Sequence, residues 1–240
     1  MDAASPINQP PITFRYIFTF PDGRQDVFVI QLDGNTVDLL QEPQKELPEW
    51  TRLGVSQCPN CPLAEQEHPR CPAAVSLVGI VERFGRSLSI EQVEVRLETE
   101  ARTFVKRASL QEAVSSLIGL YMVTSGCPIM GKLKPMARYH LPFSTLEETR
   151  YRVLSMYLLA QYFIAKRGRS PDWEFKELIR LYEEIQTVNS HFFKRLAQTD
   201  VEDASLNAIV RLDAFAGSIA FTVDQQLLEE LERLFRSYGV

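Results

Sequence analysis

The chain of 240 residues is 45% hydrophobic and 24% charged, and its formal net charge at pH 7 is −5. This composition is typical of a soluble globular protein with a sizeable core, and the acidic balance argues against non-specific nucleic-acid binding through phosphate neutralisation. No segment has the roughly 20 uncharged apolar residues of a membrane-spanning helix, and the first residues lack a signal-peptide pattern, so we expect a cytoplasmic protein with no membrane contact.

The N-terminal part of the chain predicts antiparallel strands. Residues 1–11 include three prolines and have no periodicity, so we expect a flexible tail. Beyond them, stretches rich in β-branched and aromatic residues alternate with turn sequences rich in Gly, Pro, Asn and Asp, which indicates a β-meander followed by two more strands. The expected strands are 12–20, 26–32, 36–40, 92–98 and 102–106.

Helical periodicity dominates the C-terminal part. One helix is expected earlier, between Cys71 and Gly85, and the others are expected at 110–124, 145–166, 171–196, 204–221 and 224–238. The helix at 145–166 is apolar nearly all round, which predicts that it is the central buried helix. Ser144 and Glu147 fit a capping box at its start.

These elements predict an α+β fold. Residues 12–108 should form an antiparallel sheet lobe that carries a cysteine-rich loop and one helix, and residues 109–240 should form a mainly helical lobe. Because each lobe has an apolar face to cover, we expect the two to pack as one compact unit.

The four cysteines are the most informative residues, because every one precedes a proline. Cys58 and Cys61 have the two-residue spacing that lets two thiolates reach one metal ion from a tight turn. Cys71 and Cys127 are each expected where a helix begins, and free backbone N–H groups there favour the thiolate form. Four cysteines are too few for a disulfide scaffold. The pattern predicts a four-thiolate metal site that joins the sheet to the helical lobe.

The metal is less clearly indicated than its ligands. Cys58-Pro59-Asn60-Cys61 resembles the first half of a zinc knuckle, which implies structural zinc, although Pro62 stands where a knuckle has glycine. Cysteine followed by proline is also similar to the end of the bacterial ferredoxin cysteine motif, which implies an iron–sulfur cluster. Zinc is the first expectation and an iron–sulfur cluster is the alternative; a disulfide, thiol redox chemistry and no cofactor are the remaining interpretations.

His68 offers a second ligand set. With Cys58, Cys61 and Cys71 it would form a local Cys₃His site that does not need Cys127. A histidine between Glu67 and Pro69 is more often a solvated loop residue, so we prefer Cys127 as the fourth ligand.

A basic segment follows Cys127 and contains no acidic residue. Its positive or titratable side chains are Lys132, Lys134, Arg138 and His140. They indicate either cations that offset the negative charge of the thiolates or a contact with an anion or nucleic acid, and we favour the first interpretation.

No catalytic motif is present: we find no phosphate-binding glycine loop, no paired-histidine protease motif and no serine nucleophile elbow. The sequence therefore predicts a cytoplasmic metal-binding adaptor with a protein partner, and it gives no positive support for enzymatic activity. The alternative is an iron–sulfur redox or sensor protein. Nothing in the sequence indicates an oligomeric state.

Overall fold

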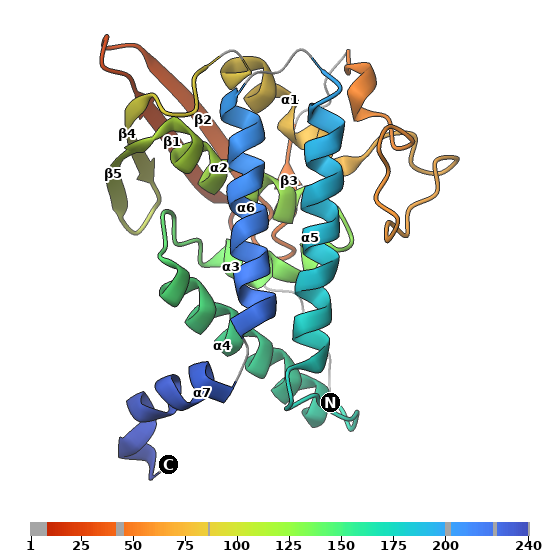
Figure 1. Cartoon of the computed structure of the whole chain (residues 1–240), viewed down its shortest axis with the longest axis vertical. Helices are drawn as coiled ribbons and strands as arrows, with labels where there is room; N and C mark the ends of the chain where they lie inside the picture. The colour runs from red at the N-terminus through yellow and green to blue at the C-terminus, as the bar shows by residue number, and fades with distance from the viewer. Residues whose placement is uncertain (1–8, 42–45, 86, 200–202, 223–224, 240) are drawn as a thin grey trace.

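The computed structural model describes residues 9–41, 46–85, 87–199, 203–222 and 225–239. They form the expected α+β fold, in which an N-terminal five-stranded antiparallel sheet precedes a mainly helical region (Figure 1). Residues 1–8 of the expected tail lie outside this range. Residues 9 and 10 pack on the later turn that contains Gly34, because a Cβ atom at Gly34 would overlap the carbonyl oxygens of Gln9 and Pro10.

The sheet has the order β3-β2-β1-β4-β5, so β1 is the central strand. The strands are β1 (Ile12–Thr19), β2 (Gln25–Leu32), β3 (Leu39–Leu40), β4 (Gln92–Glu98) and β5 (Thr103–Ser109). Since β3 lies at one edge and β4 pairs with the far side of β1, residues 41–91 must connect the two sides of the sheet. This connection carries three of the four cysteines.

One face of the sheet is covered and the other is open. Phe14, Tyr16 and Phe18 of β1 are buried, whereas Val27 and Val29 of β2 are 44% and 55% exposed. This alternation follows from the two-residue period of side chains along a strand. The covered face supplies the aromatic part of the hydrophobic core.

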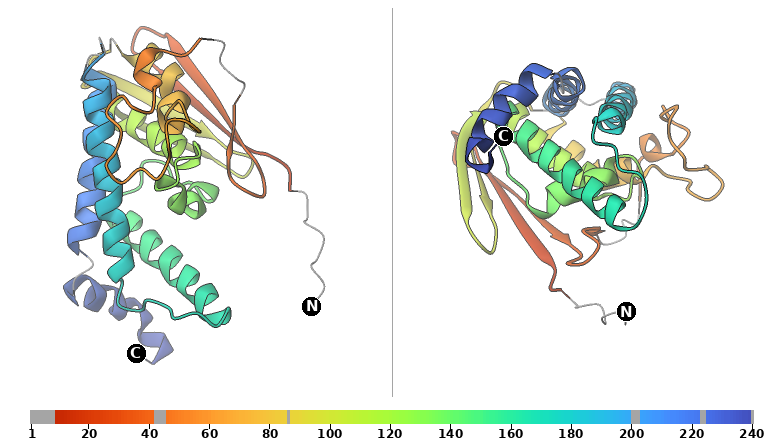
Figure 2. Two further views of the ribbon diagram at one scale, coloured as in Figure 1. Left: turned by 90° about the vertical axis from the view of Figure 1, so that its right-hand side faces the viewer. Right: turned by 90° about the horizontal axis from the view of Figure 1, so that it is seen from below.

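The helices form two layers over that face. They are α1 (Pro72–Phe84), α2 (Leu110–Thr124), α3 (Lys134–Arg138), α4 (Leu146–Lys166), α5 (Lys176–Leu196), α6 (Asp203–Thr222) and α7 (Gln225–Glu232), with 3₁₀ helices η1 (Glu49–Thr51), η2 (Met130–Leu133) and η3 (Arg233–Tyr238). Figure 2 shows α1 and α2 between the sheet and the antiparallel pair α5–α6. No helix in the described part of the chain is long and apolar enough to cross a membrane.

The central helix is α2, so the expectation that helix 145–166 is central is wrong. α2 contacts the sheet, α1 and α6, and residues on all its sides are buried. α4 instead packs on α3 and α6 and leaves Leu159, Tyr162 and Phe163 roughly half exposed. A helix that is apolar on all sides is buried only where other elements pack against it. Few elements pack against α4, so several of its apolar side chains stay exposed.

Two helix starts also differ from the expectation. The capping box of α4 is formed by Thr145 and Glu148, one residue later than Ser144 and Glu147, because Thr145 accepts from the Glu148 backbone and Glu148 accepts from the Thr145 backbone. α5 begins at Lys176 rather than 171. Asp172 accepts hydrogen bonds from the Tyr157 hydroxyl and the Glu177 backbone, and such local bonds compete with helix formation.

The last expected helix, 224–238, is observed as α7 followed by η3. Its expected first residue, Asp224, lies outside the described residues.

Candidate metal centre

The turn from Cys58 to Cys61 is anchored on α5. The Cys61 backbone N–H donates to the Cys58 carbonyl at 3.0 Å, which closes the turn. Asn60 Nδ2 then donates to the backbone carbonyl of Glu184 at 3.1 Å. The first cysteine pair is therefore held against the helical layer even though it lies in a loop.

Cys71 lies at the N-cap of α1, with Pro72 in the first turn, as the sequence predicts. Its carbonyl accepts from the Val75 backbone at 3.0 Å, and its own N–H donates to the Thr51 carbonyl at 2.8 Å. Proline fits the first turn because its missing N–H would have no partner within the helix. These bonds fix the backbone of Cys71 at the junction of the loop and α1.

Cys127 follows Gly126, whose φ of +94° lies in the left-handed region after α2. The next element is a turn that leads to η2, so no α-helix begins directly after Cys127 and this expectation is corrected. The N–H groups of Ile129 and Met130 nevertheless donate to the Cys127 sulfur and oppose the rise of its pKa that burial causes. The turn thus supplies the donors that we expected from a helix N-terminus.

The segments that carry the cysteines lie side by side. A Cβ atom at Gly126 would lie 3.8 Å from the Cβ of Pro72, which places the Cys127 backbone beside that of Cys71. Lys132 Nζ lies 3.1 Å from Oε2 of Glu184. The backbone carbonyl of the same glutamate accepts the hydrogen bond from Asn60. The Cys58–Cys61 turn and the segment after Cys127 therefore meet at the same point of α5.

The thiols also interact electrostatically. Burial raises the pKa of the Cys58 thiol to about 12, and negative charge on Cys71, Cys127 and Cys61 adds to the rise. Because neighbouring charges shift a pKa strongly only at short range, the four sulfur atoms share one region of the protein. All four are free thiols of intermediate exposure.

Arg195 of α5 places a buried positive charge beside this region. Its side chain is 2% exposed, and it donates to the carbonyls of Trp50, Arg52 and Leu53, the first at 2.7 Å. Its charge lowers the pKa of Cys58. Burial lowers the pKa of Arg195 itself, and negative charge on Cys71 and Cys61 opposes that shift. Sequence analysis missed this residue, because an arginine in the last turn of a helix is ordinarily a solvated helix-end cation.

One family comparison matches this chain. The model of a family described as a domain of unknown function (DUF6901) matches residues 12–236. The chain belongs to this family. No curated protein and no solved structure matches it. The DUF6901 match covers the sheet, the helical region and all four cysteines, so the cysteine region lies inside the family domain rather than in an added segment.

The side chains of the DUF6901 domain that we expected to offset the thiolates are engaged elsewhere. Lys132 pairs with Glu184, Lys134 pairs with Asp38, and Arg138 donates to the Gly34 carbonyl. His140 is bonded through Nε2 to the Tyr16 hydroxyl at 2.6 Å, and burial lowers its pKa to about 3. The cation that acts on the thiols is Arg195, and the segment presents no row of unpaired cations.

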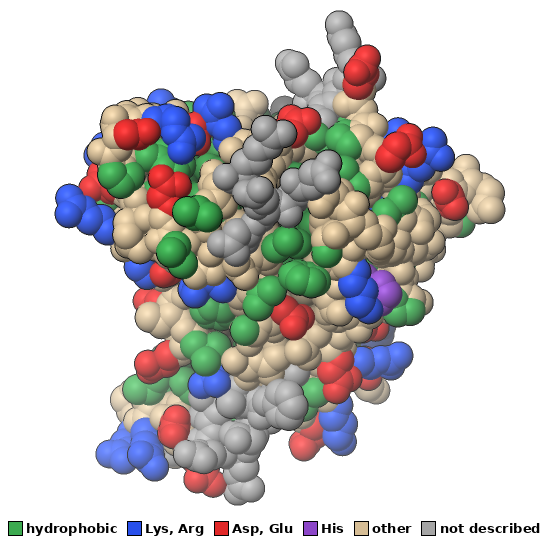
Figure 3. Space-filling model, turned by 45° about the horizontal axis from the view of Figure 1, so that its top comes forward, with side chains coloured by type: hydrophobic (Ala, Val, Ile, Leu, Met, Phe, Trp, Pro, Cys, Tyr) green, Lys and Arg blue, Asp and Glu red, His purple; other side chains and the backbone are tan. Residues whose placement is uncertain are grey.

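His68 is exposed in the loop between the cysteines, and its backbone N–H donates to the Ala64 carbonyl at 2.8 Å. Among the residues that the structure describes, no group of three or more His, Cys, Asp or Glu side chains adopts an arrangement that could hold a metal ion. The four thiols are thus near enough to interact through their charges without converging on one point. On the face of the DUF6901 domain shown in Figure 3, basic and acidic side chains are intermingled.

Proposed function

We propose that the protein binds one structural zinc ion through Cys58, Cys61, Cys71 and Cys127. The observation that carries this proposal is the placement of the cysteine segments: Gly126 lies against Pro72, and the Cys58–Cys61 turn and the segment after Cys127 both bond to Glu184 of α5. Four soft sulfur donors from three chain segments suit the tetrahedral coordination of Zn²⁺. Rotation of the four side chains toward a common point would complete the site.

The proposed ion would join parts of the chain that are distant in sequence. The Cys58–Cys61 turn and Cys71 belong to the connection across the sheet, whereas Cys127 follows α2. With all four positions filled by protein thiolates, no position is left for water or substrate, so the role is structural and not catalytic. Arg195 supports the proposal because a buried cation offsets part of the negative charge of a four-thiolate centre.

The function that follows is that of a metal-stabilised binding or adaptor protein. Its partner would be a protein rather than nucleic acid, because the cations after Cys127 are engaged within the chain. Exposed apolar side chains on α4, such as Leu159, Tyr162 and Phe163, are typical of surfaces that contact other proteins.

An iron–sulfur cluster in a redox or sensor protein is the second candidate. The N–H groups of Ile129 and Met130 that donate to the Cys127 sulfur are the observation that favours it. Hydrogen bonds to sulfur and nearby positive charge both tune the potential of such a cluster.

Metal analysis of protein purified without oxygen, from cells supplied with both zinc and iron, tests the two candidates. The zinc proposal predicts a colourless protein with one zinc ion per chain. A brown protein with broad visible absorption, iron and acid-labile sulfide would support the cluster instead. A folded protein that contains neither metal would contradict both.

A further inference from the structure

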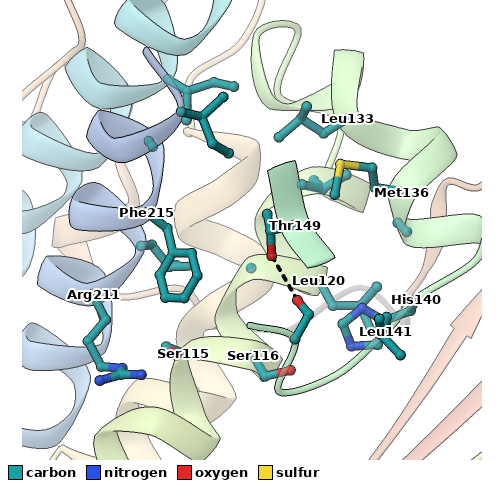
Figure 4. Close-up of a pocket in the computed structure, with 18 of the residues that line it drawn as sticks. Ser115, Ser116, Leu120, Leu133, Met136, His140, Leu141, Thr149, Arg211 and Phe215 are labelled. Atoms are coloured by element: carbon teal, nitrogen blue, oxygen red, sulfur yellow. Dashed lines mark hydrogen bonds between the residues drawn. The ribbon is translucent and has the colours of Figure 1, made fainter. Parts of the chain in front are cut away.

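A second feature of the molecule is an apolar cavity of about 220 Å³ among α2, α4, α5 and α6. Figure 4 shows Arg211 and Phe215 of α6 on one side of it and His140 and Leu141 on the other. Apolar side chains form most of its wall, and no cysteine lines it. An apolar cavity of about 150 Å³ is large enough for benzene, so this one has room for a larger apolar group.

Two buried polar atoms at the cavity have no hydrogen-bond partner in the described part of the structure. They are Oδ1 of Asn189, whose side chain is 1% exposed, and Nε of Arg211. A buried polar atom without a partner destabilises the folded chain, and in native proteins such atoms are few. Nε of Arg211 is a donor and Oδ1 of Asn189 is an acceptor, so an anionic ligand would remove this cost at the arginine.

The two side chains lie at similar heights on neighbouring helices. A Cβ atom at Gly217 of α6 would closely approach Nε2 of Gln186 on α5, which fixes how the antiparallel pair is aligned. From that alignment, Asn189 lies within about one helical turn of Arg211 along the pair. Both therefore belong to the same end of the cavity.

The charge around the cavity is positive. Arg152 and Arg211 both line it, and neither forms an ion pair with a carboxylate of the described residues. Arg152 donates to the carbonyls of Met136 and Tyr139; burial lowers its pKa, and the charges of Tyr182 and Glu148 oppose this. Glu112, the one carboxylate among the described lining residues, is paired with Lys106 at 2.7 Å.

We propose that this cavity binds a small amphipathic carboxylate, such as a medium-chain fatty acid. The apolar chain would fill the space between α2 and α6, and the carboxylate would accept a hydrogen bond from Nε of Arg211. The proposal is independent of the metal, since the cavity and the cysteines share no residue.

Titration of the full-length, metal-loaded protein with octanoate and with 1-octanol tests the proposal. We expect saturable one-to-one binding of octanoate by calorimetry and binding of octanol at least tenfold weaker, because charge-assisted hydrogen bonds are the stronger ones. Arg211→Gln should weaken octanoate binding about tenfold or more and leave octanol binding unchanged. The matched control is Arg180→Gln, an exposed arginine of α5 outside the cavity, which should change neither.

The NMR signals of isoleucine methyl groups show where octanoate binds, without the need for a variant. Octanoate should shift the methyl signals of Ile185 and Ile219, which line the cavity, and should not shift that of Ile90, which is 71% exposed. The proposal is overturned by absent saturable binding, by equal affinity for acid and alcohol, or by shifts at Ile90 with none at Ile185 and Ile219. A protein that is purified without any zinc and still binds octanoate would contradict the zinc proposal alone.

Discussion

The cysteine region and the apolar cavity differ in how they are encoded. Each cysteine precedes a proline, so the residues of the candidate metal site are visible in the sequence although they come from three separate segments. The cavity has no such pattern, because its wall combines ordinary core residues of several helices with arginines that look like surface residues. Chemically unusual residues can be found by reading the chain, whereas an empty volume exists only after the helices have packed.

The largest effect is expected from Cys127→Ser. Structural zinc in small zinc-binding peptides contributes about 10–16 kcal/mol to folding, so loss of one ligand should greatly weaken zinc binding and lower the midpoint of thermal unfolding. Metal content and unfolding temperature are the measurements. His68→Gln is the control and should retain full zinc content. Full zinc content in Cys127→Ser, with loss in His68→Gln, would show that the local Cys₃His set is the true site.

Replacing Arg195 should have the next largest effect. Arg195→Met leaves the carbonyls of Trp50, Arg52 and Leu53 without their donor, and we expect the free energy of unfolding to fall by about 3 kcal/mol. Urea unfolding of the metal-loaded protein measures this, with Arg180→Gln as the exposed control. A fall below about 0.5 kcal/mol would show that the fold does not depend on these three hydrogen bonds.

Acid should destabilise the fold through His140. Its pKa is about 3 in the folded chain, against about 6.5 when unfolded, because burial disfavours its charged form. Between these values the unfolded chain binds the extra proton, so stability should fall by about 1.4 kcal/mol for each pH unit below 6.5. His140→Gln should flatten this dependence between pH 6.5 and 4.5 in urea unfolding. An unchanged slope would show that other groups cause the acid sensitivity.

The smallest effect should come from the cavity itself. Asn189→Leu replaces a buried amide that has an unpaired oxygen with an apolar side chain of similar size, so the free energy of unfolding should rise by about 1 kcal/mol. The same variant should still bind octanoate, because the proposed partner of the carboxylate is Arg211. A destabilised variant would show that the Asn189 amide is satisfied.

Local sequence signals predicted much of the fold. Alternation and turn residues identified the strands, and Cys71 with Pro72 marked the start of α1. The starts of α4 and α5 were misplaced because several residues near each start could cap, and only the packed structure selects Thr145 and the Asp172 bonds. The central position of α2 depends on neighbours that lie far apart in sequence.

The candidate sites divide in the same way. Cys58, Cys61, Cys71 and Cys127 were identified from residue type and spacing, which are local properties. Arg195 was not, because its interest comes from burial against the loop at residues 50–53, more than 140 positions away. The orphaned atoms of Asn189 and Arg211 depend in the same manner on how α5 and α6 pack.

X-ray absorption at the zinc edge, on the purified full-length protein, tests the central claim most directly. The Cys₄ site predicts one shell of four sulfur atoms at about 2.3 Å from the zinc ion, with no nitrogen or oxygen in that shell. A shell that includes nitrogen or oxygen, or fewer than four sulfur atoms, would contradict the proposed ligand set.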